Sequence, residues 1–194
     1  GLEMGHLTNH HNNDIAIVAT SQLQYRIGKR AWLTAGGRIQ KLSKFDAKLP
    51  LSGLFGIQYD FTNERRIDIL TNRFRWYVQA NTGFRRSFFN MDNLVYGGAL
   101  GMNVTPKHGL RIEYLGTEKN QGADGTYYNW MSLSPEYVFN VTNSCLGEDD
   151  KRRVDMELFA GLDVMIHSSS LLDSKTRVGY NFGTQINANI TKSI

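Results

Sequence analysis

The residues with the clearest potential for chemistry are a histidine and a hydroxyl that lie two positions apart near the start of the chain. His6 and Thr8 share one face of an extended segment, where an imidazole can take the proton of a hydroxyl nucleophile. Such a pair also needs a third group that orients the imidazole. The strand predicted next, 15–27, offers only glutamines, so a carboxylate would have to come from Glu3, Asp14 or a distant strand. We therefore expect no catalysis from this pair.

Two other groupings of side chains are better explained without a metal or an active site. One is a cluster of metal-binding side chains, namely His6, His10, His11 and Asp14. Adjacent histidines of an extended chain point to opposite sides, so they rarely bind one ion. The other is a set of carboxylates, namely Asp155, Glu157 and Asp163. The chain has enough arginines to neutralise these carboxylates, so we expect salt bridges, no metal and no cofactor.

The elements that would position these groups are β-strands. Residues 177–190 alternate between an apolar phase that begins with Val178 and Tyr180 and a polar phase that begins with Arg177 and Gly179. Period two predicts a strand with one apolar face. A strand over this range is far longer than the ~5–6 residues typical of globular proteins. It suits a membrane-spanning barrel, in which apolar side chains meet lipid and polar ones line the interior.

The same alternation recurs along the whole chain. Clear examples occupy 15–27, 51–61, 73–85, 131–141 and 154–166, and weaker ones occupy 31–43, 94–105 and 108–116. Residues 1–8 are a candidate for a tenth strand. We predict an all-β fold, an antiparallel up-and-down transmembrane β-barrel of about ten strands, with eight strands or a larger barrel as alternatives. An even count would place both ends of the chain at one end of the barrel.

The polar phase of these strands carries arginines and carboxylates in near balance, and Arg38 is among them. An unpaired buried charge is costly, so a narrow closed interior needs such a balance. The alternative interpretation of these mixed charges is that they form the water-facing side of an ordinary β-sandwich. The interior charge network predicted from this phase consists of Arg26, Arg73, Arg75, Arg85, Arg111, Arg177, Asp60, Glu113, Glu136, Asp155, Glu157 and Asp163.

Composition limits the remaining classes. The 194 residues suit a single domain, 1–194. No run of about 18 apolar residues is present, so no transmembrane helix is predicted. The net charge is +4 and the basic residues are scattered, which argues against a nucleic-acid partner. The single Cys145 has no partner for a disulfide within the chain.

With these features the chain resembles small bacterial outer-membrane β-barrels, especially the style common in Bacteroidetes. The resemblance lies in the alternating strands, the arginine-rich interior and phrases such as Leu54-Phe55-Gly56-Ile57-Gln58-Tyr59-Asp60-Phe61. It implies a location in the bacterial outer membrane, with outer-membrane lipid or lipopolysaccharide as the partner.

The segment around His6 also resembles, incompletely, the His-x-Ser-Asn motif of the lipid A deacylases, which are outer-membrane barrels. The resemblance implies that His6 is the general base and that Asn9 matches the asparagine of the motif. Thr8 stands where that family has its nucleophilic serine, and no glutamate follows on the next strand. We therefore predict a barrel without catalysis that acts through its outer loops or as a membrane anchor. The alternatives are a deacylase-like hydrolase and a soluble β-barrel that binds a ligand.

Overall fold

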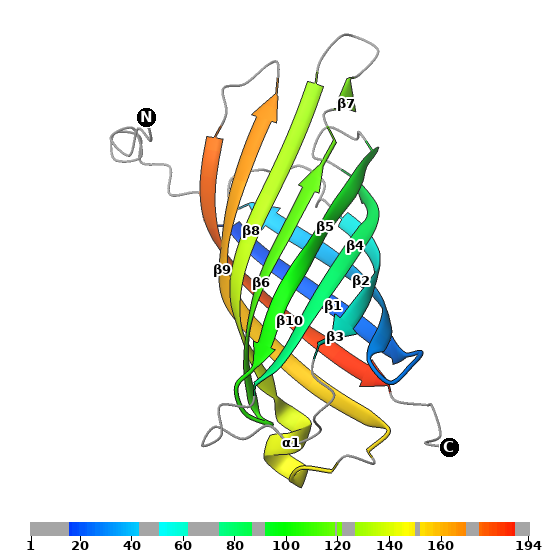
Figure 1. Cartoon of the computed structure of the whole chain (residues 1–194). Coiled ribbons are helices and arrows are strands. Elements are labelled where there is room, and N and C mark those ends of the chain that lie inside the picture. The colour runs from blue at the N-terminus through cyan, green and yellow to red at the C-terminus, as the bar shows by residue number, and fades with distance from the viewer. Residues whose placement is uncertain are drawn as a thin grey trace.

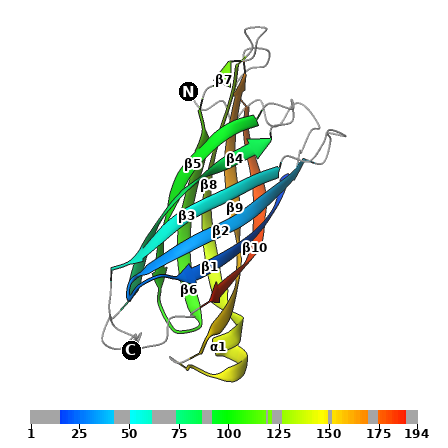
Figure 2. The same ribbon diagram turned by 90° about the vertical axis from the view of Figure 1, so that its right-hand side faces the viewer.

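The computed structural model confirms the predicted fold class. It describes residues 16–42, 51–61, 74–86, 92–118, 120–121, 127–149, 152–169 and 175–188. Within them, nine strands form a closed β-barrel, and a short helix lies at one end (Figures 1 and 2). The count of nine is close to the ten predicted.

The strands of the barrel wall are long. Their bounds are β1 Ala16–Arg26, β2 Ala31–Leu42, β3 Leu51–Asp60, β4 Arg75–Arg86, β5 Asp92–Asn103, β6 His108–Thr117, β8 Tyr127–Asn140, β9 Val154–Ser169 and β10 Lys175–Ala188. The two-residue strand β7, Asn120–Gln121, pairs with the start of β8, while β6 pairs with the rest of β8. Helix α1, Val141–Leu146, follows β8, and the side chain of Asn140 caps it by accepting a hydrogen bond from the amide of Asn143 at 2.7 Å.

The barrel closes through a parallel pair of strands. Neighbouring strands along the wall are antiparallel except β1 and β10, which pair in parallel from Ala16 opposite Gly179 to Tyr25 opposite Ala188. This follows from the odd count, because the first and ninth strands of an up-and-down wall run in the same direction. The β1–β10 ladder leaves no gap for a tenth strand in the wall. Residues 1–8, proposed as that strand, lie outside the described residues.

The two ends of the barrel are named here by the elements they carry. The α1 rim is the end at which β8 passes into α1, and the β7 rim is the end beside β7 (Figure 1). Strand β1 begins at the β7 rim and β10 ends at the α1 rim. The expectation that the wall would start and finish at the same end depended on an even count and is therefore wrong for these strands.

Burial alternates along the strands as the sequence pattern predicts. In β4, for example, every second side chain from Tyr77 to Arg85 is buried, and the side chains between them are exposed. The apolar phase points outward, away from the barrel axis. Val178, Phe182 and Ile57 are 57%, 52% and 55% exposed, so their predicted outward placement is confirmed. A small apolar cluster of Leu54, Val95, Leu115 and Trp130 lies inside the barrel.

Candidate functional site

The two faces of the barrel wall differ sharply in charge. Outward positions of the described strands carry no Asp, Glu, Lys or Arg except at or next to the strand ends, where Lys41 and Arg86 stand at the β7 rim. The inward positions carry the charged residues, and most of these are buried. The candidate functional features are therefore a polar lumen and an apolar outer surface.

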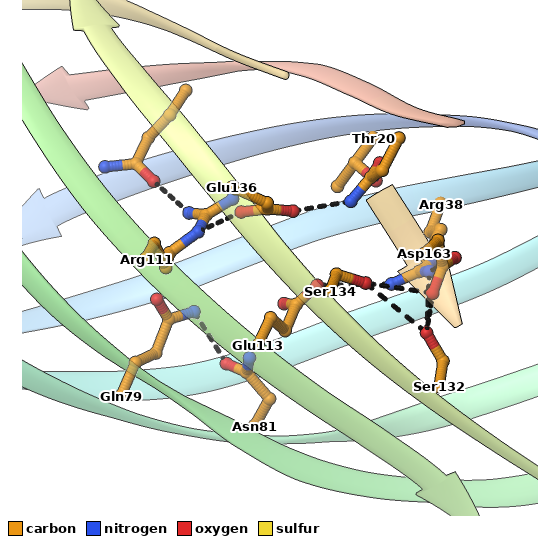
Figure 3. Close-up of polar contacts among 12 residues, drawn as sticks. Thr20, Arg38, Gln79, Asn81, Arg111, Glu113, Ser132, Ser134, Glu136 and Asp163 are labelled. Carbon is orange, nitrogen blue, oxygen red and sulfur yellow. Dashed lines mark hydrogen bonds and ion pairs between the residues drawn. The ribbon is translucent and has the colours of Figure 1, made fainter. Parts of the chain in front are cut away.

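One buried cluster in the lumen surrounds Arg38, which projects from β2 and is 1% exposed. Its Nη1 donates to Glu113 of β6 at 3.1 Å, and its Nη2 is paired with Asp163 of β9. Two serines of β8 complete the cluster, since Ser132 and Ser134 both donate to the Asp163 carboxylate. Figure 3 shows these side chains converging from four strands. The cluster thus ties separate parts of the wall together across the lumen.

A second buried cluster lies nearer the α1 rim, around Arg111 of β6. Its guanidinium pairs with Glu136 of β8 and also donates to Gln185 of β10 at 3.1 Å (Figure 3). The side-chain amide of Asn181 donates to the same Glu136 carboxylate. The Arg111 guanidinium also lies 4.2 Å from the ring centroid of Phe159. Each charge in this cluster is therefore paired and hydrogen-bonded, as a group in a low-dielectric interior needs to be.

A third cluster lies at the α1 rim, where Asp60 ends β3. Arg75 forms a salt bridge with its carboxylate, the indole of Trp32 donates to it at 3.1 Å, and Gln58 donates to it at 3.0 Å. Gln58 in turn accepts a hydrogen bond from Gln24 at 2.8 Å. Side-chain amides therefore link the charged residues into longer chains, as they also do near the middle of the lumen, where Gln79 donates to Asn81 at 2.8 Å (Figure 3).

Several residues of the predicted network contact partners that the prediction did not name. Asp155 pairs with Arg152 at 3.2 Å, outside the lumen clusters. Glu157 accepts hydrogen bonds from the amides of Gln185 and Asn140 at 3.0 and 3.4 Å. Arg26 donates to backbone carbonyls in the β1–β2 turn.

Of the three remaining arginines of the predicted network, two lie in described strands and one does not. Arg85 donates to Gln40 at 2.7 Å. Arg177 is inward and half-buried in β10. Arg73 lies outside the described residues.

The predicted charge network left out Arg38, although the period-two pattern places Arg38 on the polar phase. The side-chain amides that join the clusters are uncharged, so the pattern of charges in the sequence does not identify them.

The segment that carries the candidate histidines and hydroxyl is not placed. His6, Thr8, Asn9, His10, His11 and Asp14 all lie outside the described residues, so the resemblance of this segment to a deacylase motif stays a prediction. In the part of the chain that the structure describes, no group of three or more His, Cys, Asp or Glu side chains is arranged to hold a metal ion. Among the same residues, no helix has the length and apolar character needed to cross a bilayer.

Comparison with known proteins gives no further guidance. No protein family, no curated protein and no solved structure matches this chain.

Proposed function

We propose that the protein is an integral outer-membrane β-barrel without catalysis, which acts through its outer loops or as a membrane anchor. The observation that carries this proposal is the segregation of charge, since charged side chains point inward along the strands and apolar ones point outward. A lipid-facing surface requires this arrangement, because a charge at the bilayer midplane of a barrel costs about 2–4 kcal/mol. A closed barrel also leaves no unpaired sheet edge in the bilayer.

The outer surface argues against the soluble alternative. Soluble monomers rarely expose a contiguous apolar patch larger than about 300–600 Å². Here exposed apolar side chains occur on every strand of the wall, for example Leu23, Leu100 and Leu162, which are 50%, 49% and 48% exposed. A soluble ligand-binding barrel would place its apolar phase inside, yet here the apolar phase points outward and the lumen holds buried ion pairs and amides beside a small apolar cluster.

Exposed aromatic side chains lie toward both ends of the outer surface. Tyr25, Tyr59 and Trp76 lie near strand ends at the α1 rim, whereas Phe84 and Tyr96 lie toward the β7 rim. Two aromatic girdles of this kind mark the interfaces of membrane barrels. Bacterial single-chain barrels have even strand numbers, and this barrel departs from them, although membrane barrels with an odd number exist.

Lipid headgroups or lipopolysaccharide are the partners that this surface suits. Lys41 and Arg86 point outward at the β7 rim, directly beyond the apolar side chains of Ile39 and Phe84. Cations at this depth are placed to meet phosphate groups at the membrane surface.

An arginine scan of two positions on one strand tests the proposal. Ile57 and Leu51 both point outward from β3 and are both 55% exposed, but Ile57 lies well inside the strand and Leu51 lies at its β7-rim end. We expect Ile57→Arg to destabilise the protein folded in lipid vesicles by about 2–4 kcal/mol, and Leu51→Arg to destabilise it by about 0–1 kcal/mol. Folding is followed by the shift in gel mobility between heated and unheated samples.

The matched pair distinguishes membrane insertion from simple exposure. In a soluble barrel both positions face water, so both substitutions would be tolerated equally. Equal stability of the two variants, or a wild-type protein that stays folded and monodisperse without detergent or lipid, would contradict the proposal. Fractionation of expressing Gram-negative cells should place the wild-type protein with the outer membrane.

A further inference from the structure

A row of four inward side chains crosses adjacent strands near the β7 rim. Arg38 of β2 lies opposite Ser52 of β3, Ser52 lies opposite Arg85 of β4, and Arg85 lies opposite Asn93 of β5. Neighbouring strands are about 4.8 Å apart, so these side chains line one continuous stretch of the lumen wall. All four are fully buried, with at most 1% of each residue exposed. Ser52, Arg85 and Asn93 are each one residue from a strand end, which places the row just inside the rim.

Several polar atoms of this row are buried without a hydrogen-bond partner. They are the Oγ of Ser52, both amide atoms of Asn93 and the Nε of Arg38. The indole Nε1 of Trp130, from β8, is buried and unpartnered as well. Leaving such a group unsatisfied in the interior destabilises the fold, so a ligand that satisfies several of them would be bound with a gain in free energy.

The unpartnered atoms are mostly donors. The Arg38 Nε, the Trp130 Nε1 and the Asn93 Nδ2 can only donate, and the Ser52 hydroxyl can donate. The Asn93 Oδ1 is the one acceptor-only atom of this set. A group of donors in an interior is complementary to a ligand rich in hydrogen-bond acceptors, such as an oxyanion.

Two guanidinium groups lie beside the indole of Trp130. Both lie over the ring of Trp130, with the Arg85 carbon Cζ 3.9 Å and the Arg38 Cζ 5.6 Å from the ring centroid. The Nη atoms of Arg38 are held by Glu113, Asp163 and Ser132, so its Nε edge is what it can offer a ligand. Trp130 also belongs to the buried apolar cluster with Leu54, Val95 and Leu115, which gives the row an apolar neighbourhood. A few convergent polar groups beside apolar side chains are typical of small-ligand sites.

We propose that this row, together with Trp130, binds a small oxyanion such as phosphate or sulfate that reaches it from the β7 rim. The Arg38 Nε, the Ser52 hydroxyl, the Asn93 amide and the Trp130 indole donate to the anion, and the Arg85 guanidinium lies beside the indole. This goes beyond the proposed function, because the site is in the lumen and does not depend on what surrounds the barrel.

Titration of the folded full-length protein with inorganic phosphate tests the site. The protein in detergent micelles is titrated with sodium phosphate, and in parallel with sodium chloride at equal ionic strength and pH. The readouts are the midpoint of thermal unfolding and the tryptophan fluorescence. We expect a saturable rise of the unfolding midpoint and a saturable fluorescence change with phosphate, and neither with chloride. Sulfate should compete with phosphate.

Three variants locate the binding. Asn93→Leu and Ser52→Ala remove donors of the row, and we expect each to weaken the apparent phosphate affinity at least tenfold. Thr34→Val is the matched control, because Thr34 Oγ1 is also buried and unpartnered but lies on β2 away from the row, toward the α1 rim. It should bind phosphate as the wild type does. Ser52→Ala is the smallest change and keeps the test decisive if Asn93→Leu does not fold.

Two results would overturn the proposal. If phosphate and chloride had the same effect on the wild type, the unpartnered atoms would be satisfied by water alone. If phosphate bound to the wild type, Ser52→Ala and Thr34→Val with equal affinity, the anion would bind elsewhere on the chain.

Discussion

Individual buried charges link the strands of the barrel wall to one another, some between neighbours and some across the lumen. Arg38 of β2 pairs with carboxylates on β6 and β9, and Arg111 of β6 pairs with Glu136 of β8. In a low-dielectric interior a charge that loses its partner is left with an uncompensated desolvation cost. The contribution of these pairs to the stability of the fold is therefore seen mainly when one partner is removed.

The substitution Glu136→Ala measures this cost. Glu136 is 4% exposed, and its removal leaves the Arg111 guanidinium buried without its carboxylate. We expect a loss of about 3–5 kcal/mol in the free energy of unfolding, measured by urea titration of the protein in lipid vesicles. Asp155→Ala is the control, because its pair with Arg152 is partly exposed and should contribute roughly 1 kcal/mol or less. Equal small losses would indicate a hydrated lumen.

At this scale the sequence predicted which side chains point inward but not which of them meet. Period two assigns Arg38, Glu113 and Asp163 to the polar phase of three strands, and each of them is buried. Their contact depends on how the wall curves and closes, and neither can be derived from one strand. The unpartnered atoms of Ser52 and Asn93 were likewise beyond sequence reasoning, because partners are known only after the lumen is assembled.

At the scale of the strands, the alternation of side chains predicted each strand clearly where the outward-pointing residues are large. Strands β3 and β4 were clear in the sequence, whereas β5 had a weaker pattern because Gly97, Gly98 and Gly101 interrupt both of its phases. Some glycines are needed for close approach of neighbouring strands. A Cβ at Gly161 would overlap the carbonyl oxygen of Pro135 and lie 2.8 Å from the Cα of Glu136, while one at Gly53 would meet nothing within 4 Å.

The parallel pairing of β1 and β10 can be tested by cysteine cross-linking in a Cys145→Ser background. Ala19 lies opposite Phe182 in the parallel ladder, so the pair Ala19→Cys and Phe182→Cys should form a disulfide in the folded protein. The control pair is Ala19→Cys and Ile186→Cys, which an antiparallel ladder centred on Ser21 and Thr184 would bring together. In the parallel ladder the control cysteines are offset by about 13 Å along the strands, so no bond should form.

Gel mobility after oxidation, with and without reductant, measures the cross-link. A bond in the control pair alone would contradict the parallel closure.

At the scale of the whole molecule, a barrel of this class was predictable but the parity of its strand number was not. The sequence supplied nine clear or weaker alternating segments and one doubtful segment, residues 1–8. Strands β1 and β10 decide the count, because the wall closes between them. Because they pair directly along ten residue positions, the wall is complete without that segment.

The filled lumen predicts that the protein does not form a wide diffusion pore. Side chains from β2 contact side chains from β6 and β9, so the clusters around Arg38 and Arg111 obstruct the axis. In planar lipid bilayers we expect no steady conductance of the size given by porins. Bilayers without protein are the control, and swelling of proteoliposomes in a small sugar is a second measurement. A stable, open conductance or rapid sugar entry would show that the clusters do not close the lumen.

The parallel pairing of β1 and β10 also limits circular permutation of the chain. In an even-stranded barrel the first and last strands meet the same rim, so a few residues can join them and new termini can be cut elsewhere. Here a linker from the end of β10 back to the start of β1 would have to run the length of the 11 residues of β1, about 36 Å when extended. It would pass through a lumen that already holds ion pairs or, in the proposed membrane location, through lipid that cannot satisfy its backbone. Circular permutation of this barrel should therefore abolish folding, although its wall is continuous all the way round.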